Sequence, residues 1–179
     1  MDAILMAGGS GSRLYPLTKG TNKHLLAVAN KPMIYYSLSV LLLANVKRIF
    51  LVTNPDFGNR FESIISVLKT LGFEIKILIQ EQAGGIAEGI SLCENCISSD
   101  SFLLMLGDNF FYGPNLSEKL TAFVQSDSPC SILCYKIKNP SQLGVAKIVD
   151  GKVVEIREKP TEYIGEDAIT GLYKLDKKA

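Results

Sequence analysis

The residues best suited to chemistry lie in a glycine-rich segment that follows a short apolar run. Gly8, Gly9 and Gly11 come directly after residues 3–7, and Arg13 follows them. Glycines end a buried strand in this way where the backbone must approach something that a Cβ would block. Consecutive N–H groups in such a turn bind anions, and a guanidinium adds a fixed positive charge. The segment indicates either an anion site or a tight turn with an exposed arginine, and its spacing matches neither the P-loop nor G-x-G-x-x-G.

Four polar residues elsewhere have types that suit phosphate, metal or base binding. Lys23, in a polar loop, offers a compact charge to a phosphate, or is simply a solvated lysine. Asp108 follows an apolar run and offers a carboxylate to Mg²⁺, or forms an Asx turn. The amide of Gln80 suits the edge of a nucleotide base, or a surface position. His24 is the single histidine, and it is expected as a polar loop residue rather than a general base.

Apolar runs of strand length alternate with helix-like patterns through the first two thirds of the chain. Strands are expected at residues 3–7, 48–53, 74–79 and 101–106, and helices at 32–44, 61–71 and from 86 onward. Pro32 is expected to open the first helix, because its missing N–H is tolerated there. The alternation predicts right-handed βαβ units and a mainly parallel sheet covered on both faces. Ligands bind such sheets at the carboxyl ends of the strands, so the glycine loop, loop 80–85 and Asp108 are expected on one rim.

The pattern changes beyond Pro114. A helix is expected at residues 116–124, followed by strands at 131–136, 145–149, 153–158 and from 169. Asp150-Gly151 predicts a tight hairpin between two of these strands. Glu158 and Lys159 end a strand, where they could bind a sugar hydroxyl and a phosphate or form a charged strand end. Residues 1–179 are therefore expected to form one α/β domain whose far side is mixed or antiparallel.

Composition narrows the classes of partner. The chain has 179 residues, 47% of them hydrophobic, and a net charge of +1, which argues against nucleic acid and anionic membranes as partners. Its longest apolar runs are too short to cross a membrane, and the N-terminus lacks the features of a signal peptide. Cys93, Cys96, Cys130 and Cys134 are expected to be buried, reduced thiols rather than zinc ligands or disulfides. We expect a cytoplasmic protein.

Five segments taken in order resemble the sugar-1-phosphate nucleotidyltransferases, and most of all their thymidylyltransferase branch. They are residues 5–18, 31–36, 106–112, 158–160 and 170–173. The resemblance implies a Rossmann-like, three-layer α/β/α domain with a mixed, mostly parallel sheet. It also implies a Mg²⁺-dependent reaction that joins a sugar 1-phosphate, with glucose 1-phosphate favoured, to dTTP or UTP and releases pyrophosphate. The family's tendency to oligomerise leaves a homo-oligomer open.

The same resemblance implies a role for each matching residue. Arg13 and Lys23 would be catalytic, Arg13 by stabilising the leaving pyrophosphate and Lys23 by neutralising the reacting phosphates. Asp108 would bind Mg²⁺. The nucleotide would be held by Gly8, Gly9, Gly11, Ser12, Arg13, Gln80 and Gly85. The sugar phosphate would be held by Asn109, Gly144, Glu158, Lys159 and Ile169.

The chain departs from the thymidylyltransferase pattern in several places. It has His24, Ala27 and Leu143 where that pattern has Gln, Pro and Tyr, and Leu143 lies next to the expected sugar pocket. The family also continues well past residues 170–173 and there supplies a second aspartate for the metal. The chain is therefore expected to be a fragment of a longer protein, or a short member with impaired or altered catalysis. A non-catalytic module that binds a nucleotide or a sugar nucleotide is the alternative.

Overall fold

The fold is taken from a computed structural model. It describes residues 1–9, 11–82 and 84–178. Ser10 of the glycine segment, Ala83 of loop 80–85 and Ala179 at the end of the chain lie outside the described residues.

Four parallel strands form the first part of the sheet, in the order β5-β4-β1-β6. Their bounds are β1 Asp2–Met6, β4 Arg48–Thr53, β5 Glu74–Ile79 and β6 Ser101–Leu106. Strand β1 is buried along its whole length, which explains why it reads as a continuous apolar run. These strands match the predicted ones to within a residue.

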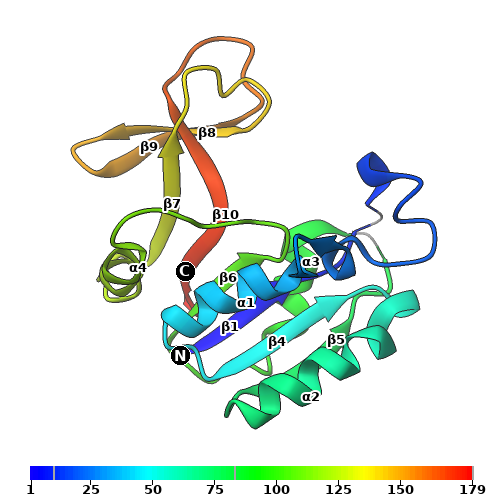
Figure 1. The fold of residues 1–179 in the computed structure, drawn as a ribbon. Coiled ribbons are helices and arrows are strands. Elements are labelled where there is room, and N and C mark those ends of the chain that lie inside the picture. The colour runs from blue at the N-terminus through cyan, green and yellow to red at the C-terminus, as the bar shows by residue number, and fades with distance from the viewer. Residues whose placement is uncertain (10, 83, 179) are drawn as a thin grey trace.

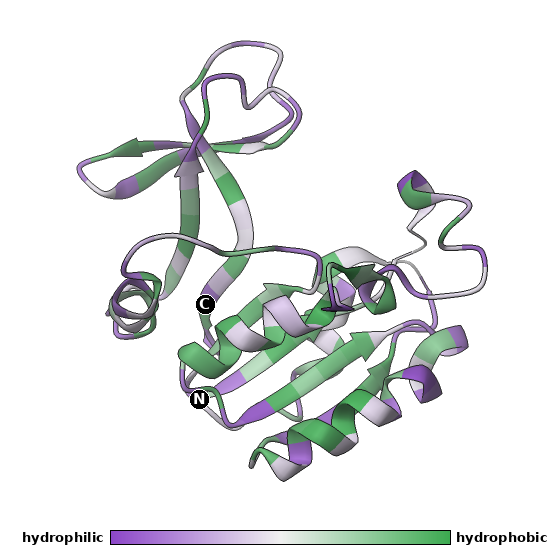
Figure 2. Ribbon diagram, in the orientation of Figure 1, coloured by the Kyte–Doolittle hydropathy of each residue, from purple (hydrophilic) through white to green (hydrophobic). Residues whose placement is uncertain are grey.

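Helices cover both faces of these strands. On one face α1 (Ile34–Leu43) and α2 (Glu62–Thr70) share an apolar cluster with alternate residues of β1, among them Ala3 and Leu5. On the other face α3 (Gly85–Cys93) packs against Ile4 and Met6. Figure 1 shows the resulting three layers, and Figure 2 shows how strongly hydrophobic residues concentrate in the central strands. The predicted three-layer α/β/α architecture is confirmed.

Antiparallel strands extend the sheet beyond β6. Strand β10 (Asp167–Asp176) lies antiparallel to β6 and also pairs with β7 and β8. The remaining bounds are α4 Leu116–Val124, β7 Cys130–Lys136, β8 Gly144–Val149 and β9 Lys152–Glu158. The β8–β9 hairpin projects away from the parallel strands (Figure 1). Its turn residues have positive φ angles, 49° at Asp150 and 73° at Gly151, as a two-residue hairpin requires.

Two details of the first helix differ from the prediction. Pro32 does not open it, because Lys31–Pro32 forms a short strand, β3, that pairs with β2 (Ala27–Val28). The helix begins at Ile34 instead. The apolar spacing of Ile34, Leu38, Leu41 and Leu42 would place all four on one buried face, but Leu42 is 52% exposed, because the other three set the face that contacts the sheet.

Two global expectations can be compared with the described residues. All four cysteines are free thiols; Cys93 is buried as expected, whereas Cys130 is exposed, contrary to the expectation of buried thiols. None of the described helices is both long and apolar enough to cross a bilayer.

Candidate active site

The glycine segment forms a tight turn between β1 and a 3₁₀ helix at Ser12–Leu14. Gly9 and Gly11 have φ angles of 96° and 62°, a region that side chains disfavour. A Cβ on Gly11 would also come within 2.8 Å of Thr18 Cγ2. The Thr18 hydroxyl donates to the Gly11 carbonyl at 3.0 Å and ties the loop together. Glycine at position 11 is therefore required by both backbone angle and space.

Lys23 and Asp108 form an ion pair across the rim of the sheet. Lys23 Nζ lies 2.5 Å from Asp108 Oδ2, and their side chains are 23% and 36% exposed. Burial alone would raise the pKa of Asp108, but the hydrogen bond and charge of Lys23 hold it below its ordinary value. Asp108 is therefore a carboxylate at neutral pH. Its partner Lys23 can release it and pair with another anion instead.

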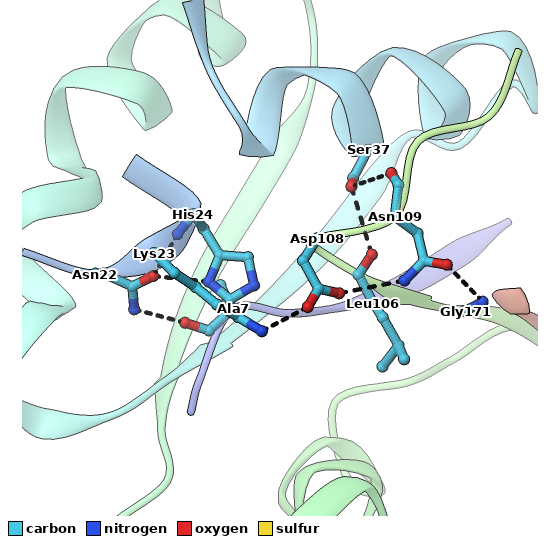
Figure 3. A network of polar contacts seen from close by, with 9 residues as sticks. All are labelled: Ala7, Asn22, Lys23, His24, Ser37, Leu106, Asp108, Asn109 and Gly171. Atoms are coloured by element: carbon cyan, nitrogen blue, oxygen red, sulfur yellow. Dashed lines mark hydrogen bonds and ion pairs between the residues drawn. The ribbon is translucent and has the colours of Figure 1, made fainter. Parts of the chain in front are cut away.

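Asn22 and His24 fix the position of Lys23. Asn22 is buried, and its Nδ2 donates to the Ala7 carbonyl at the end of β1, at 2.8 Å. Its Oδ1 accepts from the His24 backbone N–H and lies 2.7 Å from His24 Nδ1 (Figure 3). Because Asn22 Nδ2 is directed at Ala7, Oδ1 acts as the acceptor, so Nδ1 carries the imidazole proton.

His24, expected as a polar loop residue, is buried and only 2% exposed. Burial and the nearby charge of Lys23 lower the pKa of His24 to about 4. The ring is therefore neutral near pH 7, and it packs against Gly107, where a Cβ would lie 2.8 Å from His24 Cδ2. His24 acts as a structural link between the loop and the end of β6.

Asn109 connects Asp108 to strand β10. Its Nδ2 donates to Asp108 Oδ1 at 3.2 Å, and its Oδ1 accepts from the Gly171 N–H at 2.9 Å (Figure 3). A Cβ on Gly171 would come within 2.6 Å of Asn109 Nδ2, so the contact needs glycine there. Ser37 of α1 donates to the Asn109 carbonyl at 3.2 Å. The Asp108 carboxylate is thus held from one side by Lys23 and from the other by the side-chain amide of Asn109.

Two cavities adjoin at the Lys23–Asp108 pair. One of about 520 Å³ lies over the glycine loop and is lined by Gly9, Gly11, Ser12, Arg13, Leu14, Lys23, Met33 and Asp108. The other, of about 280 Å³, is lined by Met6, Gly8, Gly9, Lys23, His24, Gln80, Gly85, Ile86, Leu106 and Asp108. The structure therefore gathers all the residues predicted for the nucleotide and the metal around two adjoining cavities.

The residues predicted for the sugar phosphate form a separate group on the antiparallel strands. Gly144 pairs with Glu158 across β8 and β9, and a Cβ on Gly144 would lie 3.1 Å from Glu158 Oε2 and 3.7 Å from Ile169 Cδ1. Lys159, with a φ of 44°, places Nζ 3.8 Å from Glu158 Oε1. In the described part of the chain, none of these four residues lines either cavity. Asn109 joins the two groups through Gly171.

Three supporting residues were not predicted. Asn22, Ser37 and Glu88 each hold neighbouring polar groups through two or three hydrogen bonds. A signal for Asn22 was present, because asparagine commonly bonds the backbone two residues further along the chain. Glu88 lies in the first turn of α3, where carboxylates cap N–H groups. The contact of Ser37 depends on how α1 packs, so its sequence neighbours carry no signal.

The residues at the cavity junction suit a magnesium ion. Mg²⁺ in nucleotide sites takes one or two carboxylates and completes its shell with phosphate oxygens and water. Asp108 is an ionised, half-buried carboxylate that opens onto both cavities. Among the described residues, no cluster of three or more His, Cys, Asp or Glu could hold a metal by protein ligands alone. Asp108 therefore fits an ion that arrives with phosphate, rather than a protein-enclosed metal.

A mixed sheet with helices on both faces and a glycine turn at the carboxyl rim define the class of Rossmann-like α/β proteins. Within that class, the chain belongs to the nucleotidyl transferase family, whose model matches residues 2–179.

Curated glucose-1-phosphate thymidylyltransferases are similar to nearly the whole chain. The one from Neisseria meningitidis is 38% identical over 180 residues, which cover 100% of this chain and 62% of the relative. The one from Mycobacterium tuberculosis is 41% identical over 177 residues, which cover 98% and 61%. The chain thus spans about three fifths of the length of these relatives.

Solved structures share the fold. A Bacillus anthracis protein to which glucose-1-phosphate thymidylyltransferase activity is ascribed superposes with a TM-score of 0.90 at 36% identity, covering 99% of this chain and 72% of its own. UDP-glucose pyrophosphorylase from Acinetobacter baumanii reaches 0.84 at 19% identity, covering 99% and 74%. At that identity the second similarity supports the fold alone.

Proposed function

We propose that this chain is the nucleotide-binding domain, over residues 1–179, of a sugar-1-phosphate nucleotidyltransferase. It would join glucose 1-phosphate to dTTP or UTP and release pyrophosphate. The observation that carries the proposal is the Lys23–Asp108 pair at the junction of the two cavities, one over the glycine loop and one beside Gln80. A triphosphate placed along the glycine loop would bring its phosphorus atoms to this junction. The similarity to curated thymidylyltransferases supports the same reaction.

The reaction needs positioning and charge neutralisation rather than proton transfer. An oxygen of the sugar 1-phosphate attacks the α-phosphorus of the triphosphate, and the bond to the leaving pyrophosphate breaks. The attacking phosphate is already ionised, so no general base is required. A neutral, hydrogen-bonded His24 with a pKa of about 4 agrees with that chemistry.

The residues at the larger cavity would neutralise the negative charge of the phosphates. The N–H groups of the glycine loop would bind the triphosphate, and Arg13 would stabilise the pyrophosphate as negative charge develops on it. Lys23 would exchange the carboxylate of Asp108 for a phosphate oxygen. Bound Mg²⁺ would neutralise phosphate charge, with Asp108 as its protein ligand.

The antiparallel strands would hold the sugar phosphate. Glu158 would accept hydrogen bonds from sugar hydroxyls over the space left by Gly144, and Lys159 would pair with the phosphate. Asn109 and Ile169 would line the side nearest the nucleotide.

The four free thiols agree with a cytoplasmic setting.

Pyrophosphate release tests the proposal directly. The protein would be incubated with Mg²⁺, each nucleoside triphosphate and a panel of sugar 1-phosphates. We expect release that requires both substrates and is fastest with dTTP or UTP and glucose 1-phosphate. Absence of release with every pair, together with nucleotide binding by calorimetry, would contradict the enzyme and leave a binding module.

That second candidate rests on one observation. In the described part of the chain, Asp108 is the single carboxylate that lines either cavity. A site with one metal carboxylate binds a nucleotide–magnesium complex but supplies less charge for the reaction. A nucleotide-binding module with weak or no turnover is therefore the alternative.

A further inference from the structure

The side-chain amide of Gln80 has its orientation dictated by two neighbours. Gln80 is buried, and its Nε2 donates to the Gly85 carbonyl at 3.0 Å and to Glu88 Oε2 at 2.7 Å. A carbonyl and a carboxylate only accept hydrogen bonds. Both hydrogens of Nε2 are therefore used, and the amide cannot be flipped without placing Oε1 against two acceptors.

Glu88 is itself held in place. Its Oε2 also accepts from the Gly84 N–H at 2.8 Å, at the start of α3. A carboxylate in the first turn of a helix is favoured by the helix dipole. The next residue, Gly89, lets α3 approach β1 closely, since a Cβ there would lie 2.4 Å from Met6 Cε. Glu88 is thus a fixed acceptor.

The consequence of this orientation appears on the other side of the amide. Gln80 Oε1 is directed at Gly8, where a Cβ would lie 3.6 Å from it. Gly8 and Gln80 both line the cavity of about 280 Å³. That cavity is consequently offered a hydrogen-bond acceptor, and not a donor, by Gln80.

We propose that Glu88 is a positioning residue that makes the site selective for uracil or thymine through Gln80; this inference rests on the proposed function. Both bases carry a ring N3–H, which donates to an acceptor such as Oε1. Cytosine N3 and adenine N1 are acceptors. The lone pair of either nitrogen would face the lone pair of Gln80 Oε1, and neither atom would gain a hydrogen bond. Sites built around a buried polar group discriminate strongly against ligands that leave it unpaired.

Calorimetric titration of the protein with Mg²⁺ and dTTP, UTP, CTP, ATP or GTP tests the idea. The informative variant is Glu88→Gln, which keeps the shape but offers a donor as well as an acceptor, so only the Gly85 carbonyl still opposes a flip of the Gln80 amide. We expect the affinity ratio of dTTP to CTP to fall at least about tenfold in this variant. A merely structural role would weaken all nucleotides alike. Glu94→Gln, the same charge change at the exposed end of α3, is expected to leave the ratio unchanged.

An N3-methylated dTTP provides a second arm that needs no variant. It lacks the N–H but keeps the rest of the base, and it should bind the wild-type protein at least about tenfold more weakly than dTTP. Equal binding of the two, or an unchanged ratio in folded Glu88→Gln, would overturn the inference. Failure of the wild-type protein to bind any nucleotide would instead contradict the proposed function.

Discussion

Lys23 Nζ lies 2.5 Å from Asp108 Oδ2, although the two residues are 85 positions apart in the chain. The pair joins the loop after β1 to the end of β6 and separates the two cavities of the site. Each partner suits a different part of a magnesium–triphosphate complex. Lys23 suits the phosphate oxygens, and Asp108 suits the metal. The two side chains satisfy each other, so binding of the complex would replace one ion pair by two favourable contacts.

Removing the cation tests the role of Lys23. We expect Lys23→Ala to lower kcat/KM for pyrophosphate release by about 10²–10³-fold, because a preorganised charge at the reacting phosphates is lost. Lys19→Ala in the same loop, at an exposed position, is the matched control and should change kcat/KM less than about twofold. Steady-state rates at saturating Mg²⁺ measure both. Similar losses in the two variants would show that Lys23 acts only through the general charge of the loop.

The glycine loop can be tested by adding one methyl group. Gly11→Ala should lower the free energy of unfolding by more than Gly72→Ala, as measured by urea denaturation. Both positions have positive φ, 62° and 85°, and each should lose about 1 kcal/mol on that account. Only at Gly11 does the new Cβ approach another residue, Thr18 at 2.8 Å, whereas nothing lies within 4 Å at Gly72 among the described residues.

The same pair of variants separates stability from binding. Gly11→Ala should also weaken nucleotide binding, while Gly72→Ala, at the end of α2, should leave it intact. Equal nucleotide affinity in the two variants would argue that the glycine loop is only a tight turn.

Much of this arrangement could be predicted from the sequence. The alternating apolar runs predict parallel strands, and strand ends in such a sheet meet on one rim, which is why Gly11, Gln80 and Asp108 were expected together. The rest depends on side-chain directions that only tertiary packing determines. Glu88 reads as a surface residue of a short helix, and Pro32 reads as a helix start until its pairing with Ala27 is seen.

His24 predicts a change of stability with pH. Its pKa is about 4 in the folded protein and near 6.5 when exposed, so the unfolded state binds the additional proton between these values. Stability should therefore be full above about pH 6.5 and fall by roughly 3 kcal/mol as the pH drops to 4. Urea denaturation of wild type and His24→Gln across this range measures the effect. The variant should show a shallower slope, and an identical slope would contradict a buried neutral imidazole.

Asp2 predicts a second effect in a more acidic window. Arg48 donates to both its oxygens, at 3.0 and 2.7 Å, and the Ser98 N–H donates at 2.9 Å. Burial alone would raise the pKa of Asp2, but the hydrogen bonds from Arg48, Ser98 and Ser99 lower it to about 2. A lowered carboxyl pKa stabilises the fold above pH 3.8, and this contribution is lost as the pH falls to 2.

The corresponding variant is Asp2→Asn, with Asp127→Asn at an exposed position as the control. Asp2→Asn should cost roughly 2 kcal/mol of unfolding free energy at pH 7, and the cost should shrink toward pH 2. Denaturation curves at pH 7, 4 and 2 would show it. A cost that stays constant over this range would mean that packing, not charge, is lost.

The most direct measurement compares pyrophosphate release by the wild-type protein and Asp108→Asn, with dTTP, glucose 1-phosphate and a titration of Mg²⁺. The wild-type protein should release pyrophosphate in a Mg²⁺-dependent manner. The variant, which keeps the shape of the side chain but loses its charge, should be slower by at least about 10²-fold at every Mg²⁺ concentration. Equal rates and equal Mg²⁺ dependence in the two proteins would contradict a reaction centred on Asp108 and Lys23.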